Sequence, residues 1–412
     1  MKILITTGQG IINLFDTAVF LKKHNIDVKV ITGWVPGEHF PEAAIRFLGR
    51  IIGRKNLVEG LKRRRIEELS SDEIRTCARS EFFIQFLFLL SRYRLVSRDW
   101  AACTGWKAFG AQSKKYIADA DVFHVRSGAG QGGAIMKARQ AGMKILVDHS
   151  IAHPAEMLKQ LTKARKGAPP AEYAGPGERF WNLVLQDCRM ADRLMVNSNY
   201  VKESFVENGF DASKIDVVNM GINEAFFQVK NNWAAQDKVK VLFIGGFNLR
   251  KGAQLIIEAA EQLISRNFDF ELNIVGDIGR DIDMPSWFSE YDGIHLHGSV
   301  PVKQLIPFLS ENDLFIFPSY AEGCAQSLKI AMATGIPVIT TRQSGGPVTH
   351  LQTGYIIPDD SASALADAIV EMSSNPGLRE RIGAAACRLI KNEHTWDAYA
   401  QDTIKVYKRL LD

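Results

Sequence analysis

The sequence predicts an α/β protein with two domains, and three observations support this prediction. The chain has 412 residues, too many for one ordinary core, and its hydrophobic content of 46% is enough to fill two. Segment 314–341 has the pattern strand, loop, helix and strand. Segment 2–32 opens the chain with the same alternation. Such alternation is typical of parallel sheets covered by helices.

Local signals indicate each element of segment 314–341. The apolar run Leu314–Phe317 ends at a proline and is typical of a parallel strand buried on both faces. A helix is predicted over Gln326–Thr334 and should end at Gly335, because glycine suits the position after a helix. A strand resumes at Val338–Thr341. The loop 320–325 is therefore expected at the carboxyl edge of a sheet, where open α/β sheets bind ligands.

Glu322 in this loop is the first candidate site residue. It stands beside Gly323, which lets a ligand approach the backbone closely. The free amides that open the next helix favour an anion at the same place. The alternative is that Glu322 only complements the helix dipole, an effect of up to about 1 kcal/mol. The local pattern leaves both interpretations open.

The segment PSYAEGCAQSLKIAMATGIPVITT, residues 318–341, resembles the signature of retaining GT-B glycosyltransferases of family 4, relatives of sucrose and glycogen synthases. The residues shared with the family pattern are Pro318, Ser319, Glu322, Gly323, Ala331, Met332, Ala333, Gly335, Pro337 and Val338. The family has a second glutamate where this chain has Ile330, and an alkyl group cannot accept hydrogen bonds from a ribose diol. The resemblance runs from about Lys144 to the C-terminus.

The resemblance implies a GT-B fold, in which two Rossmann-like domains face each other across a cleft. We expect an acceptor-side domain at 1–220 with a helical insertion at about 37–120. A nucleotide-sugar-binding domain is expected at 221–395, with a final helix at 396–412 that crosses back to the first domain. Glycines and the cations Arg250 and Lys251, placed where a strand meets a helix, suit a pyrophosphate. The donor-binding residues that the resemblance assigns are Gly245, Gly246, Arg250, Lys251, Gly276, Gly323, Cys324, Ala325 and Ile330.

The expected activity is transfer of a sugar from a nucleoside diphosphate sugar to a hydroxyl acceptor with retention of configuration. No metal or cofactor is expected, and a lipid-linked or cell-surface glycan is the expected acceptor, as in bacterial polysaccharide or lipopolysaccharide synthesis. Ile330 supports an alternative, a scaffold that has lost turnover and serves as a binding or partner subunit. An epimerase or a phosphorylase on the same architecture has no motif of its own in this chain.

His153 is the second catalytic candidate, because family 4 members often place a histidine after the strand that begins at Lys144, where it contacts the donor hexose. The alternative is a loop histidine whose hydrogen bonds are satisfied. A metal site with His149 is disfavoured, since zinc needs a third or fourth ligand and no residue nearby supplies one. The pair His295 and His297 on a later strand is interpreted as structural.

The first loop, with Gly8 and Gly10, lies near the donor sugar and acceptor in GT-B enzymes. Two glycines alone are a weak signal, and the alternative is a tight turn without a role in binding.

Between residues 37 and 120 a basic stretch precedes an apolar one. The net charge of +4 is too mild to indicate nucleic acid. The cations are Arg46, Arg50, Arg54, Lys55, Lys62, Arg63, Arg64 and Arg65. The apolar run at 82–90 is far shorter than the roughly 20 residues that cross a bilayer. One interpretation is contact with an anionic membrane; the favoured one is a solvated helix followed by a buried helix.

Five cysteines without a CxxC pair fit a reducing cytoplasm, and no secretory signal is visible at the start. We therefore expect a cytoplasmic protein, with peripheral attachment to the inner face of the membrane under the first interpretation.

Overall fold

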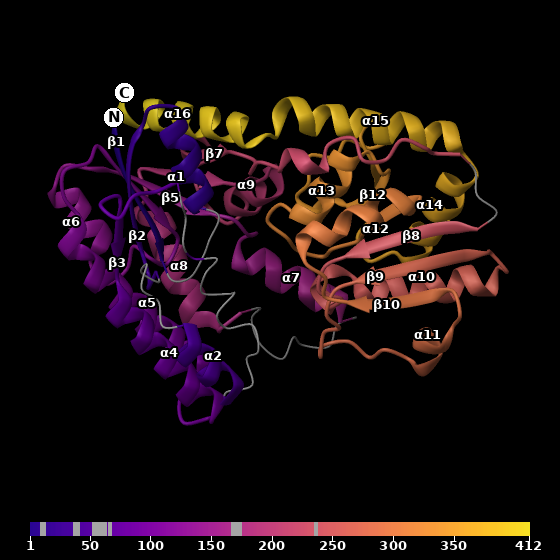
Figure 1. Cartoon of the computed structure of the whole chain (residues 1–412), viewed down its shortest axis with the longest axis horizontal. Helices are drawn as coiled ribbons and strands as arrows, with labels where there is room; N and C mark the ends of the chain where they lie inside the picture. Colours follow the sequence, from indigo (N-terminus) through magenta and orange to yellow (C-terminus); the bar gives the residue numbers. More distant parts are fainter. Residues whose placement is uncertain (9–13, 36–41, 52–63, 65–67, 166–174, 235–237) are drawn as a thin grey trace.

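The computed structural model describes the whole chain except residues 9–13, 36–41, 52–63, 65–67, 166–174 and 235–237. Two α/β domains lie side by side, and the C-terminal helices run along one edge of both (Figure 1). Each domain contains one parallel sheet with helices on its faces. The two-domain α/β prediction is confirmed.

The first sheet, within the described residues, has seven strands in the order β3-β2-β1-β4-β5-β6-β7. Its strands are β1 (Lys2–Gly8), β2 (Asp27–Thr32), β3 (Ile74–Thr76), β4 (Val122–Arg126), β5 (Lys144–His149), β6 (Arg193–Val196) and β7 (Ile215–Val217). All neighbouring strands are parallel, and the central ones are buried on both faces. Two hydrophobic clusters, one containing Phe123 and the other Ile3, are built around this sheet.

The second sheet has six described strands in the order β10-β9-β8-β11-β12-β13. Its strands are β8 (Val239–Ile244), β9 (Phe270–Val275), β10 (Ile294–Gly298), β11 (Leu314–Phe317), β12 (Val338–Thr341) and β13 (Tyr355–Ile357). One large cluster of apolar side chains forms the core of this domain. The predicted strands at 314–317 and 338–341 have the observed bounds, because a short run buried on both faces has clear ends in the sequence.

Helices connect the strands and cover the sheets. In the first domain they are α1 (Leu14–Lys23), α2 (Glu42–Ile51), α4 (Ala78–Arg92), α5 (Arg98–Ser113), α6 (Ala134–Gln140), α7 (Pro154–Ala164), α8 (Glu178–Met190) and α9 (Asn199–Val206). In the second they are α10 (Ala253–Ser265), α11 (Ser286–Glu290), α12 (Leu305–Glu311), α13 (Gln326–Thr334), α14 (Ala362–Ser373) and α15 (Pro376–Glu393), followed by α16 (Trp396–Leu411). Short 3-10 turns include η4 (Leu249–Lys251) and η3 (Glu224–Phe226).

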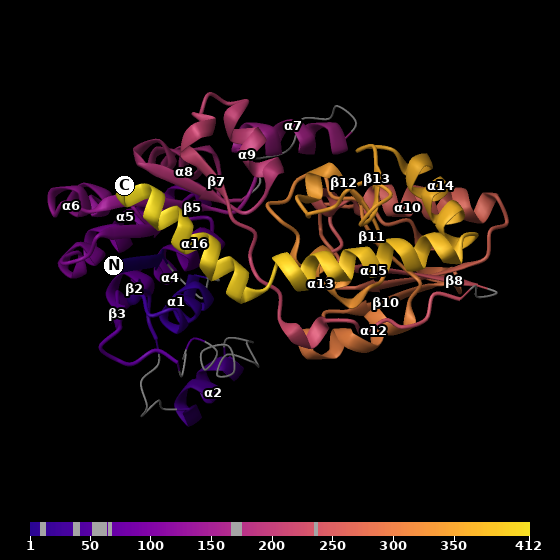
Figure 2. The ribbon, with the colours of Figure 1, turned by 90° about the horizontal axis from the view of Figure 1, so that it is seen from above.

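The chain passes between the domains twice, and the two passages touch. The backbone N–H of Ile222 donates to the carbonyl of His394 at 2.9 Å. A Cβ on Gly221 would lie 2.5 Å from the Cα of Trp396, so only glycine fits this crossing. Beyond it α16 lies across the first domain, and Tyr407 binds His124 there with 2.7 Å between the hydroxyl and Nδ1 (Figure 2).

Two expectations about the first domain need correction. The region expected to be helical also contains β3, a three-residue strand that pairs with β2 and is too short to show periodicity. The favoured interpretation of 82–90 as a buried helix is wrong, because Phe82 is 58% and Phe86 54% exposed.

The basic stretch of this region is only partly described. Arg54, Lys55, Lys62, Arg63 and Arg65 lie outside the described residues, as does Gly10. Arg64 is not a solvated cation, since it forms an ion pair with the buried Glu81.

We predict that Tyr407→Phe lowers the free energy of unfolding by about 1–3 kcal/mol, because it leaves the buried Nδ1 of His124 without a partner. Urea denaturation of the full chain measures the effect. Tyr93→Phe is the matched control, since Tyr93 is 70% exposed. Equal midpoints for Tyr407→Phe and the parent protein would contradict the prediction.

Candidate functional site

Two strand-to-helix loops of the second domain meet at their backbones. The N–H of Tyr320, in the β11–α13 loop, donates to the carbonyl of Arg250, in the β8–α10 loop, at 2.9 Å. The Ser319 hydroxyl donates to the same carbonyl at 3.0 Å. Gly252 has φ 82°, and a Cβ there would lie 2.1 Å from the carbonyl oxygen of Pro318. Only glycine permits this contact, which brings the predicted cations beside the predicted acid.

Glu322 lies between the two cations. Its Oε1 is 2.7 Å from Nη1 of Arg250 and 3.6 Å from Nζ of Lys251. Arg250 Nη1 also donates to the carbonyl of Ala321 at 2.7 Å, which orients the guanidinium. The buried Oε1 of Glu322 makes these two ion-pair contacts, and it accepts no well-directed hydrogen bond from the described residues.

Burial lowers the pKa of Lys251, and the neighbouring Glu322 carboxylate acts against this shift. The ammonium lies 5.3 Å from the centre of the Phe317 ring and above Gly245, where a Cβ would be 3.0 Å away. Gly245 and Gly246 follow β8, and Gly276 follows β9. The structure thus gathers the glycines, both cations and Glu322 at the carboxyl ends of neighbouring strands.

The backbone amides of the β11–α13 loop are not equally available to an anion. The N–H of Ala325 donates to the carbonyl of Ser344 at 3.0 Å, and that of Glu322 donates to Gln343 at 2.9 Å. The donor-binding candidate Ala325 therefore has no free amide for an anion. The amides of Gly323 and Cys324 make no hydrogen bond to a described residue, so these two remain as donors.

The first domain packs against one side of the β11–α13 loop. A Cβ on Gly323 would lie 1.9 Å from the carbonyl oxygen of Ser150, and the Ser198 hydroxyl donates to the carbonyl of Gly323. Ala321 packs with Ala152 and Tyr200 of the first domain. Helix α7 lies at this junction, between the two domains (Figure 1).

His153 caps α7, one residue beyond Ala152. Its Nδ1 accepts from the N–H of Ala155 at 3.2 Å, and its ring packs edge-on against Phe205 at 5.2 Å. Its Nε2 is buried without a partner among the described residues. Burial lowers the pKa of His153 to about 4, so the ring is neutral at pH 7. Nδ1 is thus structural, as in the alternative interpretation, and the ring packs against Phe205 and Phe210 of the first domain.

Three polar side chains that the sequence did not single out border the same loop. The atoms Asn197 Oδ1, Tyr200 Oη and Gln326 Nε2 are buried without hydrogen-bond partners among the described residues. A buried polar atom left unpaired costs about 1–3 kcal/mol, so such atoms favour a bound polar ligand. No sequence signal marks them, because pairing depends on neighbours distant in the chain.

The remaining candidates are placed as follows. Ile330 lies on α13 and packs against the core of the second domain. Gly8 ends β1 with φ 76° and adjoins Trp106 of α5. His149 ends β5 and binds the Ser127 hydroxyl at 2.8 Å. His297 binds Asn273 at 2.7 Å, as a structural histidine does.

Two family models match the chain. The family described as Glycosyltransferase Family 4 matches residues 14–226, and that described as Glycosyl transferases group 1 matches residues 238–375. Among curated proteins, the amylovoran biosynthesis glycosyltransferase AmsK of Erwinia amylovora is 26% identical over 53% of this chain and 56% of its own length. The chain thus spans about half the length of the curated relatives that it matches.

Solved structures are similar over the full length. Sucrose-phosphate synthase of Thermosynechococcus elongatus has a TM-score of 0.64 at 18% identity, covering 100% of this chain and 99% of its own. Anabaena HepE in complex with UDP and glucose has a TM-score of 0.59 at 15% identity, covering 99% of this chain and 100% of its own. These similarities confirm the predicted GT-B architecture.

We predict that His149→Asn reduces the decrease in the free energy of unfolding that the parent protein shows as the pH falls. Burial lowers the pKa of His149 to about 3, so its neutral form stabilises the fold above pH 6.5, and this stability is lost as the pH falls toward 3. Between pH 6.5 and pH 5 the parent should lose about 2 kcal/mol more than the variant. Urea denaturation across this range measures the difference.

Ser127→Ala is the matched control, because it removes the hydrogen-bond partner of His149 and keeps the titrating ring. This variant should be less stable than the parent at pH 7, but its free energy of unfolding should fall with decreasing pH as steeply as that of the parent. Identical slopes for His149→Asn and the parent would show that this histidine does not resist protonation.

Proposed function

Because the chain belongs to glycosyltransferase family 4, we propose that it transfers a sugar from a nucleoside diphosphate sugar to a hydroxyl acceptor, with retention of configuration and without a metal ion. The observation that carries this proposal is the position of Glu322 between Arg250 and Lys251, where two strand-to-helix loops meet. The site combines countercharge for a diphosphate with an acid that can bind sugar hydroxyls.

Glu322 is the counter-ion of the two cations in the structure. A diphosphate that enters the β8–α10 corner competes for Arg250 and Lys251, and it brings more negative charge than one carboxylate. Both cations then bind phosphate oxygens, and the carboxylate becomes free to accept hydrogen bonds from the sugar. In this exchange the diphosphate compensates both cations, and the sugar hydroxyls hydrogen-bond the carboxylate; a buried charge left without any partner is strongly destabilising.

Transfer breaks the bond between the anomeric carbon and the diphosphate oxygen, which keeps the electron pair. The acceptor oxygen forms the new bond to that carbon from the same face, and its proton passes to the departing diphosphate. Lys251, Arg250 and the amides of Gly323 and Cys324 stabilise the growing negative charge. Glu322 stabilises the positive charge at the anomeric carbon, and the neutral His153 positions the sugar through Nε2.

The two domains must stay together for this arrangement to work. Lys163 of α7 pairs with Asp359 of the second domain at 3.0 Å, and Glu203 pairs with Arg342. The fully buried Lys329 of α13 donates to the carbonyl of Met220, beside the domain crossing. In these contacts the first domain holds residues that follow the Gly323 loop, so opening of the domains would move the donor loop away from His153.

The relatives suggest the class of acceptor. AmsK is a glycosyltransferase of amylovoran biosynthesis, and CapM of Staphylococcus aureus one of capsular polysaccharide biosynthesis. We propose a growing bacterial surface glycan, carried on a lipid, as the acceptor. A panel of nucleotide sugars, scored first by thermal shift and then by hydrolysis, identifies the donor.

We predict that Glu322→Gln and Lys251→Met each lower kcat by about 100- to 1000-fold, since each removes charge that stabilises the transition state. Hydrolysis of the donor identified by the panel is the measurement. Lys238→Ala is the matched control, because Lys238 forms an exposed pair with Asp269 and should keep parental turnover. Parental turnover in Glu322→Gln would remove that residue from the mechanism.

Ile330 supports the second candidate, a GT-B scaffold that binds a donor or partner without turnover. The Ile330 side chain cannot accept a hydrogen bond from a ribose hydroxyl, and this side chain packs against the core of the second domain. Donor binding without hydrolysis or transfer across the whole panel would favour this candidate over catalysis.

We predict that Ile330→Glu tightens binding of a nucleoside diphosphate by about 10- to 100-fold. A hydrogen bond from a ribose hydroxyl to the new carboxylate should contribute about 1.5–3 kcal/mol to binding. Calorimetric titration with UDP, the nucleotide bound in the HepE structure, measures the effect. Ile330→Leu controls for the change in packing. No gain over Ile330→Leu would mean that another group, such as Gln326, holds the ribose.

A further inference from the structure

The α4–α5 hairpin exposes a row of large apolar side chains on α4. Phe82, Phe86, Leu89 and Tyr93 recur at spacings of three and four residues, so they lie along one side of the helix. Their exposed fractions are 58%, 54%, 48% and 70%, and that of Leu95 in the following turn is 70%. This apolar row is distinct from the face that packs on α5. Rows of this kind mark interaction surfaces.

The opposite side of α4 is firmly packed, so the exposed row is not an unpacked core. Ile84 and Leu87 are buried there. Gly105 of α5 lies so close to α4 that a Cβ on it would be 2.2 Å from Ile84. The hairpin thus has a core face and a separate outward face.

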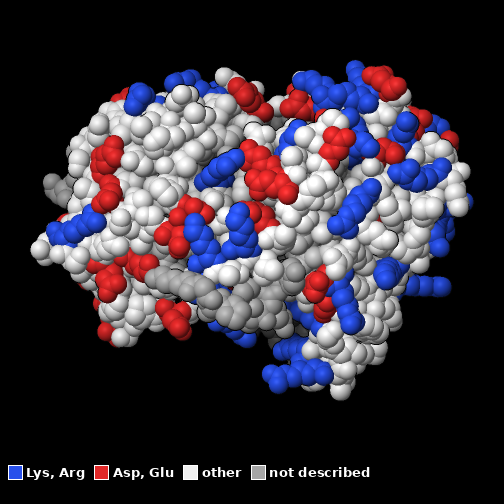
Figure 3. All heavy atoms as spheres, turned by 180° about the vertical axis from the view of Figure 1, so that it is seen from behind, with Lys and Arg blue, Asp and Glu red and all other residues white. Residues whose placement is uncertain are grey.

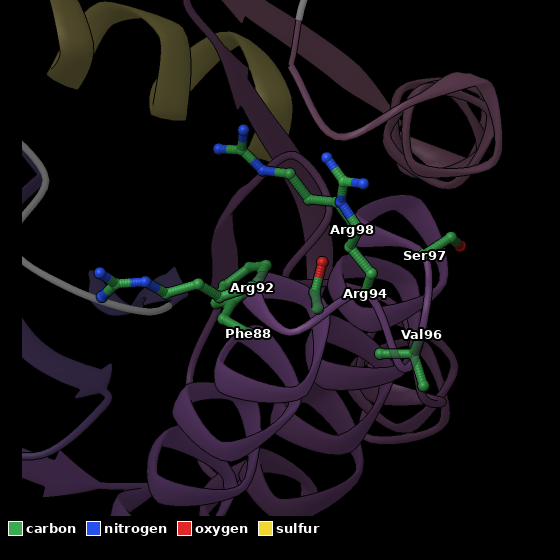
Figure 4. Close-up of a pocket in the computed structure, with 7 residues that line it drawn as sticks. Phe88, Arg92, Arg94, Val96, Ser97 and Arg98 are labelled. Carbon is green, nitrogen blue, oxygen red and sulfur yellow. The ribbon is translucent and has the colours of Figure 1, made fainter.

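Three arginines surround the turn at the end of this row. Arg92, Arg94 and Arg98 are exposed, and they line an open hollow of about 780 Å³ with Phe88 and Val96 (Figure 4). None of the three forms an ion pair with a described residue. Segment 82–98 contains no aspartate or glutamate. The end of the hairpin therefore carries uncompensated positive charge.

The acidic residues nearest in the sequence are engaged elsewhere. Glu81 pairs with Arg64 and accepts the N–H of Trp34 at 2.5 Å. Asp99 accepts the N–H groups of Arg179 and Phe180 at 3.0 and 2.8 Å, at the start of α8. Among the described residues, neither carboxylate forms an ion pair with Arg92, Arg94 or Arg98.

Arg94 occupies a backbone position that glycine would favour. Its φ is 60°, and the turn ends α4 with hydrogen bonds from Arg94 to Ser91 and from Leu95 to Leu90. Helices that end in this way usually have glycine at the left-handed position. An arginine there is disfavoured by the backbone, which points to a role for its side chain outside the fold.

We propose that the α4–α5 hairpin docks on an anionic lipid bilayer, with the arginines bound to headgroup phosphates and the apolar row placed among the upper acyl chains. Arginine beside exposed phenylalanine suits a lipid interface, whereas a nucleic-acid surface needs the charge without the apolar row. No helix among the described residues is long and apolar enough to cross a bilayer, so the contact is interfacial.

The position of the hairpin agrees with this assignment. Helices α2 and α4 form the lower end of the first domain in Figure 1, away from α15 and α16. Lys and Arg side chains gather at this end in the space-filling view (Figure 3). The proposal is independent of the transfer reaction.

Sedimentation of the full chain with vesicles tests the proposal without any nucleotide sugar. Binding is expected to vesicles of mixed phosphatidylcholine and phosphatidylglycerol, to weaken as salt rises, and to be lost with phosphatidylcholine alone. Arg92→Gln, Arg94→Gly and Arg98→Gln combined should weaken binding by about 100-fold, since each basic residue contributes about fivefold. Phe82→Ser with Phe86→Ser should remove the part of binding that survives high salt.

Matched variants separate docking from folding. Arg280→Gln, Arg381→Gln and Arg388→Gln combined remove three exposed arginines of the second domain and should bind vesicles like the parent. Arg94→Gly alone should weaken binding about fivefold without lowering the melting temperature, because glycine accepts the positive φ.

Several outcomes would overturn the proposal. Parental vesicle binding by the triple hairpin variant is one, and equal binding to neutral and anionic vesicles is another. Stabilisation by inorganic phosphate without vesicle binding would assign the arginines to a free anion, and preference for duplex DNA would assign them to nucleic acid. Loss of transfer in Glu322→Gln with intact vesicle binding would leave this proposal standing.

Discussion

The contact between the β8–α10 and β11–α13 loops is the constraint on which the site depends. Each loop follows its own strand, and the carbonyl of Arg250 accepts hydrogen bonds from the other loop. Because Gly252 touches Pro318, no side chain separates the loops. Arg250 and Lys251 of the β8–α10 loop therefore lie on either side of Glu322 of the β11–α13 loop. The ion pairs stay in place because each charge lacks a better partner until an anion arrives.

The domain junction adds a second requirement. The β11–α13 loop is held by the second domain through the amides of Glu322 and Ala325, and by the first domain through Ser198. The position of this loop therefore depends on how the two domains are arranged. The crossing at Ile222 lies close to this loop, because Cys324 contacts Asn219 and Lys329 donates to Met220. A rotation of the domains there would change the distance between His153 and the donor-binding loops.

The hairpin of the first domain shows why apolar sequence is an incomplete guide to burial. The run at 82–90 contains enough apolar residues to fill both faces of α4, while α5 covers only one. The remaining face is exposed together with three arginines whose acidic neighbours bind elsewhere in the fold. The apolar run was predicted from the sequence, whereas its exposure and the three arginines beside it became apparent only from the packing of α4.

The sequence alone determined the α/β class, the strands at 314–317 and 338–341, the helix between them, and Glu322, Arg250 and Lys251 as candidates, because these follow from local periodicity and from glycines at strand ends. It could not show β3, the occupied amide of Ala325, or the unpaired atoms of Asn197, Tyr200 and Gln326. Those depend on contacts between residues far apart in the chain. Only the tertiary structure decided them, because these hydrogen bonds and buried faces form only when segments distant in the sequence pack together.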